Sequence, residues 1–290
     1  MFQTIGVIRK FADPGVQGEV DAVCRHLRGR NREVLVDEQT ARTLSGFSAC
    51  AAACRPLTER CDLVIVVGGD GTLLHAARML EGTDVPILGI NLGRLGFLVD
   101  ISPGEMLQRI DEVLDGAFKT ENRFLLMAEH RRGDELLASG TALNDVVLHK
   151  KDVARMVGFK TYVDGRLMNH HRSDGLVVAT PTGSTAYALS GGGSLLAPDL
   201  DVVTLVPICP HTLSDRPIVV SAAGHIVLRL CEDLHGLATW DGQGNCAVEP
   251  GDEIHIRKHP VSLRLLHPAD YDYFEILRAK LGWGGSHPKR

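Results

Sequence analysis

The chain has 290 residues, of which 44% are hydrophobic and 23% charged, and its formal net charge at neutral pH is -5. This composition is typical of a globular protein of about two domains, and the slight acidity argues against nucleic acid as a partner. The seven cysteines are scattered without a CxxC pair, which indicates reduced thiols. The first residues lack the features of a signal peptide and no apolar stretch is long enough to span a bilayer, so we expect a cytoplasmic protein with no membrane partner.

Short apolar runs alternate with helical patterns over the first 120 residues. In chain order the expected elements are a strand over 2–8, a helix over 15–28, a strand over 33–36, a partly helical segment over 40–55, a strand over 63–67, a helix over 73–80, a strand over 85–90 and a helix over 104–114. This alternation predicts an α/β domain with a parallel, Rossmann-like sheet. Ligands of such sheets bind beyond the carboxyl ends of the strands.

The segment Gly68-Gly69-Asp70-Gly71-Thr72 joins a strongly hydrophobic strand to a predicted helix. Glycines bring backbone N–H groups close to an anion and the helix N-terminus adds partial positive charge, so this segment can hold phosphate. A carboxylate at Asp70 would repel phosphate unless Mg²⁺ lies between them or the carboxylate accepts a proton from an attacking hydroxyl. A β-turn with a helix-capping aspartate is the alternative. Neither GxGxxG nor a P-loop is present.

From residue 124 onward the sequence has the pattern of strands joined by tight turns. Hairpin signals lie at 132–134, 164–165, 241–242 and 251–252, and short strands are expected over 142–148, 159–163, 175–179, 225–230, 247–248 and 253–256. The second half is therefore predicted to be a mainly antiparallel β domain. Residues 284–290 are expected to form a disordered tail.

The polar segments 173–175 and 180–193 carry many hydroxyl side chains and glycines. Such a loop suits a ribose or a phosphate, although a plain polar connection ahead of a short helix is the alternative. Ser184 is not in a GxSxG sequence, which argues against a serine hydrolase. His149, His170, His171 and His211 lack metal-ligand spacing, so no metal site of the protein's own is predicted.

Together these segments resemble the bacterial NAD kinases (ATP-NAD kinase family). The matching positions are 68–72, 91–98, 144–145, 174–175, 180–187, 210–213, 216–217, 267–268 and 281–283, so the resemblance covers essentially the whole chain. The first motif alone is also similar to phosphofructokinases and lipid kinases. The Asn-Asp pair at 144–145 and the Thr-Ala-Tyr sequence at 185–187 select NAD kinase.

The resemblance implies that Asp70 accepts the proton of the 2′-hydroxyl of the adenosine ribose of NAD while the γ-phosphoryl group of ATP is transferred. Asn144 and Asp145 would bind this ribose. The further implied nucleotide-contacting residues are Gly68, Gly69, Gly71, Thr72, Arg155, Arg172, Asp174, Thr185, Ala186, Tyr187, Ala188, Leu189, Ser190 and Gln243. Family members usually have Glu at the position of Asp145 and often Pro at the position of Ser194. An arginine at the position of Arg172 accompanies a preference for NAD⁺ over NADH.

The resemblance also implies a domain organisation. Residues 1–120, with 268–290 packing back on them, would form the α/β domain that binds the phosphate donor, and 121–267 the β domain that forms the NAD site, with NAD in the cleft between them. Mg²⁺ or another divalent cation would arrive with ATP. A homo-oligomer, dimer or tetramer, is expected, in which a neighbouring subunit can complete the NAD site.

Other functions remain open from the sequence. A non-catalytic dinucleotide-binding sensor would keep the pocket without chemistry, and an intact Asp70 argues against it. An oxidoreductase would use NAD as a hydride carrier, but the usual Rossmann fingerprint is missing. Another kinase with the same glycine-rich motif, acting on a lipid or a sugar phosphate, is the third alternative.

Overall fold

A computed structural model describes residues 2–9, 17–37, 51–52, 54–93, 95–151, 156–231 and 235–283. The chain divides into two compact units, which we call the first unit (Met1–Asn122 with Leu263–Arg290) and the second unit (Arg123–Ser262). Most of the segment 40–55, the tail from 284 and Arg155 lie outside the described residues. Within the described ranges, no helix has the length and apolar character needed to cross a membrane.

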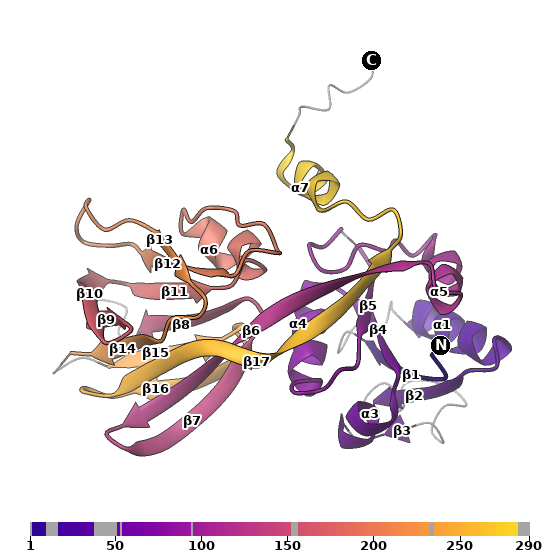
Figure 1. Ribbon diagram of the computed structural model, residues 1–290, viewed down its shortest axis with the longest axis horizontal. Helices are drawn as coiled ribbons and strands as arrows, with labels where there is room; N and C mark the ends of the chain where they lie inside the picture. Colours follow the sequence, from indigo (N-terminus) through magenta and orange to yellow (C-terminus); the bar gives the residue numbers. More distant parts are fainter. Residues whose placement is uncertain are drawn as a thin grey trace. The chain divides into compact units, whose positions relative to one another are not determined.

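The first unit contains a sheet flanked by helices (Figure 1). Its elements are β1 (Thr4–Arg9), α1 (Gln17–Gly29), β2 (Glu33–Asp37), β3 (Ala51–Ala52), α3 (Cys54–Arg60), β4 (Leu63–Gly68), α4 (Asp70–Met79), β5 (Ile87–Asn91), α5 (Met106–Leu114) and α7 (Tyr273–Leu281), together with the start of β6 (Phe118–Arg132) and the end of β17 (Glu253–Pro268). The strands lie in the order β17-β5-β4-β1-β2-β3, and every pair in this series is parallel.

Helices on both faces of this sheet explain why its strands are hydrophobic throughout. Val20 and Val23 of α1 and Ile110 and Val113 of α5 share one core with alternate residues of β1, β2, β4 and β5. Figure 1 shows α4 on the opposite face. Strands covered on both sides read as continuous apolar runs rather than as alternating ones. The predicted α/β domain with a parallel sheet is confirmed.

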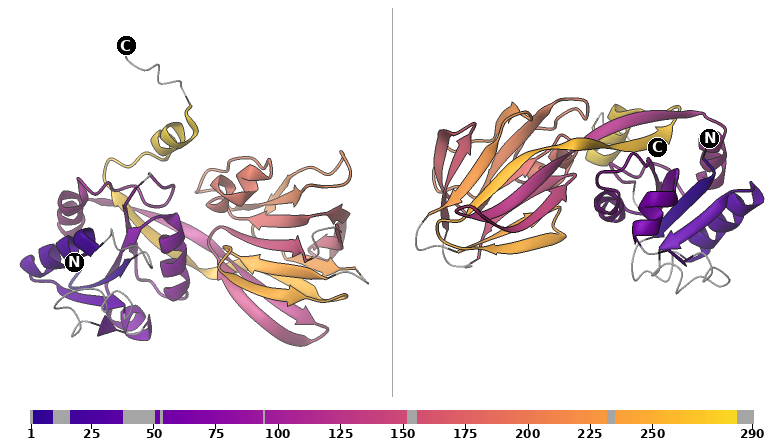
Figure 2. Two further views of the ribbon diagram at one scale, coloured as in Figure 1. Left: turned by 180° about the vertical axis from the view of Figure 1, so that it is seen from behind. Right: turned by 60° about the horizontal axis from the view of Figure 1, so that its bottom comes forward.

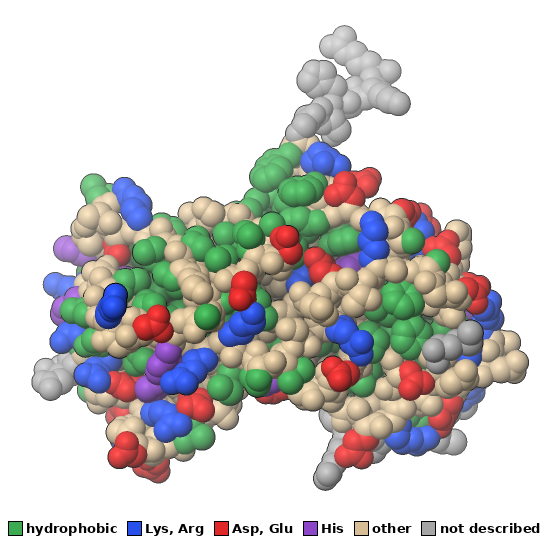
Figure 3. Space-filling model, viewed as in Figure 1, with side chains coloured by type: hydrophobic (Ala, Val, Ile, Leu, Met, Phe, Trp, Pro, Cys, Tyr) green, Lys and Arg blue, Asp and Glu red, His purple; other side chains and the backbone are tan. Residues whose placement is uncertain are grey.

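Helix α7 ends the described part of the first unit. Its N-cap Asp272 accepts the N–H of Phe274, and Gly282 ends the helix with a left-handed φ of 68°. Ile276 and Leu277 are buried. Phe274 is 59% exposed, and Figure 3 shows hydrophobic side chains gathered over α7.

The second unit is made of two antiparallel sheets (Figure 2). Besides most of β6 and β17 it contains β7 (Glu135–Ala142), β8 (Asp145–Lys150), β9 (Val157–Val163), β10 (Arg166–Ser173), β11 (Gly175–Ala179), a 3-10 turn η3 (Gly183–Thr185), α6 (Tyr187–Ser190), β12 (Val202–Ile208), β13 (Ile218–Ser221), β14 (Ile226–Leu230), β15 (Gly236–Trp240) and β16 (Gly244–Val248). One sheet has the order β13-β12-β11-β8-β15-β16, and the other runs β10-β9-β14-β17, with β6 pairing with β17 and β7.

A hydrophobic core lies between the two sheets, to which Leu176 of β11, Phe159 of β9 and Ile254 of β17 contribute. Trp240 belongs to the same core. The mainly antiparallel β domain predicted from the turn signals is therefore confirmed.

Three of the four predicted hairpins are confirmed, since the turns at 132–134, 164–165 and 241–242 join paired strands. The fourth prediction, at Gly251-Asp252, is wrong. This turn connects β16 to β17, and these strands pair in different sheets. The strand predicted over 142–148 is not continuous. β7 ends at Ala142 and β8 begins at Asp145, and Leu143 and Asn144 form the turn between them.

Asp252 is fully buried and holds the ends of β6 and β16 to β17. Its carboxylate contacts His130 at 2.8 Å, accepts hydrogen bonds from Arg132 at 2.7 and 3.0 Å, and accepts the N–H of Glu249 at 2.9 Å. Burial alone would raise the pKa of Asp252, but these donors outweigh burial and lower the pKa to about 2.

We predict that Asp252→Ala lowers the free energy of unfolding by about 1–3 kcal/mol at neutral pH, because the substitution leaves buried donors without their acceptor. A lowered carboxyl pKa stabilises the fold above the unfolded pKa of about 3.9, and this stabilisation is lost as the pH falls towards about 2. Urea unfolding should show that the difference in unfolding free energy between Asp252→Ala and the unmutated protein becomes smaller as the pH falls through this range. Asp134→Ala, in the exposed β6–β7 turn, is the control. A difference in unfolding free energy that stays constant over this pH range would contradict the lowered pKa of Asp252.

Candidate active site

The glycine-rich segment 68–72 begins at the end of β4, and the segment 95–100 follows β5. These strands are parallel neighbours, and Gly68 lies opposite Asn91 in their register. The carboxyl ends of adjacent parallel strands open at the same edge of a sheet, which is where ligands of α/β proteins bind. The two segments therefore lie side by side.

Asp70 is fixed by this arrangement. Its Oδ2 accepts the N–H of Phe97 and its Oδ1 accepts the N–H of Leu98, both at 3.0 Å. The residue also opens α4, three residues before the predicted start, because the N–H groups of Thr72 and Leu73 already bond to the carbonyl of Gly69. Both carboxylate oxygens are thus held at the N-terminus of a helix.

Glycine is required at two positions around this carboxylate. A Cβ atom at Gly96 would overlap the Oδ1 atom of Asp70, and one at Gly68 would overlap the hydroxyl of Thr72. At Gly69 and Gly71, by contrast, a Cβ atom would meet no other atom of the chain within 4 Å. The fold itself does not demand glycine there, so these two residues keep open the space in front of the helix N-terminus, where an anion is favoured.

In the second unit, the turn between β7 and β8 is held by a carboxylate that directly follows another strand. Asp241, directly after β15, accepts the N–H groups of Leu143, Asn144 and Asp145 at 2.9, 2.8 and 3.2 Å. In return its own N–H donates to the carbonyl of Asp145 at 2.9 Å. Asp241 has a φ of 52°, a backbone conformation that aspartate tolerates better than most residues.

Asp145 is 6% exposed, so its carboxyl group has lost most of its water. Burial raises the pKa of Asp145 to about 7, with a further contribution from the charge of Asp241. A carboxyl group with this pKa exchanges its proton near neutral pH, so it can donate a hydrogen bond as well as accept one. Strongly shifted carboxyl groups are a feature of functional sites.

The polar segment that follows β11 lies against the same turn. The N–H of Thr180 donates to the carbonyl of Asn144 at 2.9 Å, and its hydroxyl donates to the carbonyl of Leu143 at 2.6 Å. Gly183 lies so close to the carbonyl of Asn144 that a Cβ atom would overlap it. Ser184 is buried, donates to the carbonyl of Pro181 and accepts the N–H of Leu196, so its hydroxyl is structural.

The residues expected along η3 and α6 differ in exposure. Ala188 packs against Val147, Val177 and Val206 beneath α6. Tyr187 is 39% exposed and its ring stacks on that of His149, with the ring centres 5.9 Å apart. Thr185, Ala186 and Leu189 are partly exposed, and Ser190 is exposed. The face turned away from the core is therefore made mainly of Tyr187 and its neighbours.

Arg172 and Asp174 occupy the opposite end of β11 from Thr180. Five residues of β11 separate the two ends, which corresponds to roughly 17 Å at about 3.3 Å per residue. Lys150 forms an ion pair with Asp174 at 2.7 Å, and the side chain of Arg172 is exposed. A ligand that contacts residues at both ends of β11 within one subunit must be extended, as a dinucleotide can be.

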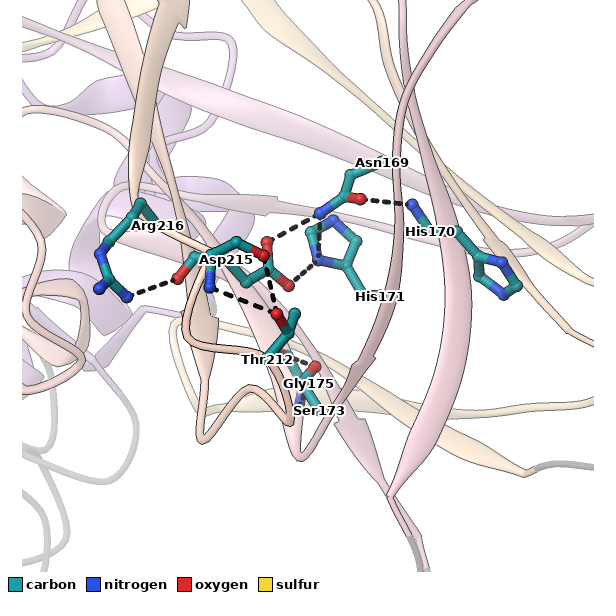
Figure 4. A network of polar contacts seen from close by, with 9 residues as sticks. Asn169, His170, His171, Ser173, Gly175, Thr212, Asp215 and Arg216 are labelled. Carbon is teal, nitrogen blue, oxygen red and sulfur yellow. Dashed lines mark hydrogen bonds and ion pairs between the residues drawn. The ribbon is translucent and has the colours of Figure 1, made fainter.

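The strand that carries Arg172 is tied to the loop before β13 by a buried polar network (Figure 4). The Asp215 carboxylate contacts Nδ1 of His171 at 2.9 Å and accepts a hydrogen bond from Asn169 at 2.8 Å. The N–H of His211 donates to the carbonyl of Arg172 at 2.9 Å. This network fixes the backbone at Arg172 while leaving its side chain exposed.

The structure brings Asn144, Asp145 and the segment 180–185 together, and Gln243 follows Asp241 in the adjacent turn. Arg155 cannot be placed, because it lies outside the described residues. Within the described ranges, no three His, Cys, Asp or Glu side chains form a group that could hold a metal ion.

Sequence reasoning missed the role of Asp241, which it treated only as a turn signal. It also missed Gly96 and the N–H groups of Phe97 and Leu98. The Asp-Gly pair at 241–242 carried the signal for a left-handed aspartate, but its partners are about a hundred residues away in sequence. Nothing local connected Gly96 with Asp70.

A carboxylate fixed beside a helix N-terminus suits phosphoryl transfer to a hydroxyl group, because the helix favours the phosphates and the carboxylate can take the proton. The fold and the site thus define a phosphotransferase with an alcohol group as acceptor. Residues 14–118 match the ATP-NAD kinase N-terminal domain and residues 143–267 match the ATP-NAD kinase C-terminal domain. The chain belongs to the ATP-NAD kinase family.

Individual relatives agree with this assignment. The chain is 48% identical to a NAD kinase of Chromohalobacter salexigens over 284 residues, which cover 97% of each chain. It is 47% identical to a NAD kinase of Pseudomonas putida over 285 residues, 98% of this chain and 96% of the relative.

Two solved structures share the fold. Yeast NADH kinase complexed with NADH has a TM-score of 0.89 at 26% identity, covering 99% of this chain and 90% of the yeast chain. A NAD kinase from Archaeoglobus fulgidus in complex with ATP has a TM-score of 0.77 at 27% identity, covering 96% of this chain and 99% of the other.

We predict that Gly96→Ala lowers kcat for phosphoryl transfer by about 10- to 100-fold, because the added methyl group displaces the carboxylate of Asp70. Steady-state kinetics with ATP and NAD measure this effect. Gly104→Ala is the matched control, since a Cβ atom there meets no other atom within 4 Å. Equal kcat values for the two variants would show that the position of Asp70 does not depend on Gly96.

Proposed function

We propose that this protein phosphorylates the 2′-hydroxyl of the adenosine ribose of NAD with the γ-phosphoryl group of ATP, giving NADP, and that Asp70 accepts the hydroxyl proton. The observation that carries the assignment of Asp70 is its double anchorage to Phe97 and Leu98 at the carboxyl end of β4. The two N–H donors orient the carboxylate, and its remaining lone pairs can accept a proton from a substrate.

The glycine-rich segment would bind the phosphates of ATP. Gly69 and Gly71 leave the front of α4 open, and the helix N-terminus attracts negative charge. ATP would enter as its complex with Mg²⁺ or another divalent cation, which neutralises charge that develops during transfer. In such reactions positioning and charge neutralisation supply most of the acceleration, so no covalent phosphoenzyme is needed.

The turn at Asn144 and Asp145 would hold the adenosine ribose. Three N–H groups of this turn are already taken by Asp241, so the turn is rigid before any ligand arrives. Where family members usually have Glu, Asp145 supplies the same carboxyl group on a shorter side chain. The amide of Asn144 and the carboxyl of Asp145 would then orient the hydroxyl groups of the ribose, with residues 185–190 and Gln243 lining the remaining nucleotide pocket.

We further propose that the protein works in the cytoplasm as a homo-oligomer, dimer or tetramer. The exposed Arg172 and the ion-paired Asp174 lie at the opposite end of β11 from Asn144. A neighbouring subunit can therefore supply these two residues to a bound NAD. Size-exclusion chromatography with light scattering tests the assembly, and a monomer with full activity would exclude it.

We predict that Asp70→Asn lowers kcat by about 10²- to 10⁴-fold with a smaller effect on the KM for NAD, because the substitution removes a proton acceptor that acts mainly in the transition state. The assay incubates purified protein with ATP and NAD and measures NADP. Asp84→Asn, an exposed aspartate of the same unit, is the control.

The same assay separates the alternatives. NAD binding by the unmutated protein without NADP formation would support a sensor. A change in nicotinamide absorbance that requires an added organic substrate would support an oxidoreductase. An Asp70→Asn variant that keeps most of its kcat would remove Asp70 from the chemistry.

Arg172 is expected to influence the choice between NAD⁺ and NADH. The family pattern at Arg172 favours NAD⁺, although a guanidinium near the cationic nicotinamide ring costs about 1 kcal/mol at about 4 Å in water. We therefore infer that Arg172 selects by geometry, through hydrogen bonds of its planar guanidinium. Arg172→Gly should raise kcat/KM for NADH relative to NAD⁺, and Arg166→Gly on the same strand is the control. An unchanged ratio in Arg172→Gly would contradict this role.

A further inference from the structure

The two N–H donors of Asp70 lie in the middle of the segment 95–100, so the position of the carboxylate depends on what holds this segment. Its own backbone contributes one bond, from the N–H of Gly96 to the carbonyl of Val99 at 3.1 Å. After it, the chain returns to the sheet edge where Ile101 forms a parallel bridge with Ile90. The side chains of Leu98 and Val99 are buried, and the two ends of the segment contact the C-terminal end of the chain.

His267, at the end of β17, holds one end of the segment. The side chain is 2% exposed and lies between two carboxylates, with Nδ1 3.0 Å from Asp100 and Nε2 3.2 Å from Glu121. Its ring stacks on Tyr271 with a centre-to-centre distance of 3.8 Å. Burial would lower the pKa of His267, but the two carboxylates outweigh burial and raise it, which favours the charged imidazolium.

Lys280, near the end of α7, holds the other end. Its ammonium group donates a hydrogen bond to the carbonyl of Leu95 at 2.6 Å and lies 4.9 Å from the centre of the Phe97 ring. The helix that presents Lys280 is capped at both ends and anchored by buried Ile276 and Leu277. The lysine is therefore presented by a fixed element rather than by a loose tail.

Between these two attachments the C-terminal segment does not pack tightly on the loop. A cavity of about 290 Å³ lies there, lined by Leu95, Asp100 and Ile101 on one side and by Tyr271 and Ile276 on the other. Leu98 and Val99 in the middle of the segment are buried, so apolar packing holds its middle, while the polar contacts of the C-terminal segment hold its two ends.

We propose that the C-terminal segment 267–280 positions Asp70 for phosphoryl transfer by holding the loop 95–100 at both ends, through His267 at Asp100 and Lys280 at Leu95 and Phe97. His267 and Lys280 are positioning residues, and they act through the N–H groups of Phe97 and Leu98. This inference rests on the proposed role of Asp70. A displacement of about 1 Å at a reacting group can cost about 10²-fold in rate, so two remote contacts can matter.

The first experiment compares single variants by steady-state kinetics with ATP and NAD. Lys280→Met and His267→Gln should lower kcat about 10-fold or more and change the KM for NAD by less than about 3-fold, because the variants shift the base rather than the nucleotide pocket. Lys280→Arg should restore most of kcat, since it keeps a cationic donor. Arg278→Met removes a positive charge from the same helix without touching the loop and should leave kcat unchanged.

The second experiment repeats both substitutions in the Asp70→Asn protein. If His267 and Lys280 act through Asp70, neither substitution should lower the residual rate further, whereas a general loss of structure would lower it again. Thermal unfolding of every variant checks folding. Lys280 is exposed, so Lys280→Met decides the inference even if His267→Gln does not fold.

The outcomes separate this inference from the proposed function. An unmutated protein that forms no NADP would defeat the proposed function itself. With active unmutated protein and an impaired Asp70→Asn variant, a kcat of Lys280→Met equal to that of Arg278→Met would overturn the inference alone. Equal losses from Lys280→Met with and without Asp70 would overturn it as well.

Discussion

Each of the two units has a carboxylate that accepts backbone N–H groups from a neighbouring loop. Asp70 accepts two such groups from the segment after β5, and Asp241 accepts three from the turn before β8. In each case one side chain fixes several backbone positions, which a single neutral hydrogen bond could not do. Charge-assisted bonds of this kind are roughly twice as strong as neutral ones, so both loops are rigid without a ligand. Rigid loops at strand ends are the condition for placing a hydroxyl group in line with a phosphorus atom.

Strand order explains why these carboxylates meet their partners. β4 and β5 are parallel neighbours, so Asp70 and the loop that follows β5 leave the sheet at the same edge. In the second unit the strands are antiparallel, so the start of β8 lies beside the ends of β11 and β15. Asn144 and Asp145 therefore lie next to the segments that follow both strands. The parallel and the antiparallel sheet thus both bring several loops together around one strand end.

The sequence was sufficient for the parts of this arrangement that depend on local pattern. Hydrophobic periodicity predicted the parallel sheet, turn pairs predicted three hairpins, and glycine spacing located the segment at Asp70. The turn at Gly251-Asp252 was misread as a hairpin, because a turn sequence does not say which sheet the next strand joins. Asp252 instead lies buried against His130 and Arg132, which precede it by about 120 residues. Contacts of this range, like those of Asp241 and His267, leave no periodic trace in the sequence.

The pair formed by Asp145 and Asp241 shows how one carboxylate changes the pKa of its neighbour. Asp241 is held as an acceptor by three N–H groups, so its negative charge remains beside the buried Asp145 and helps raise the pKa of Asp145 to about 7. An acid with this pKa takes up and releases its proton near neutral pH. A ribose offers hydroxyl groups that both donate and accept, and in the ribose site that we propose a carboxyl group that can do either matches them without a fixed charge. Burial of Asp145 is the larger cause of its raised pKa.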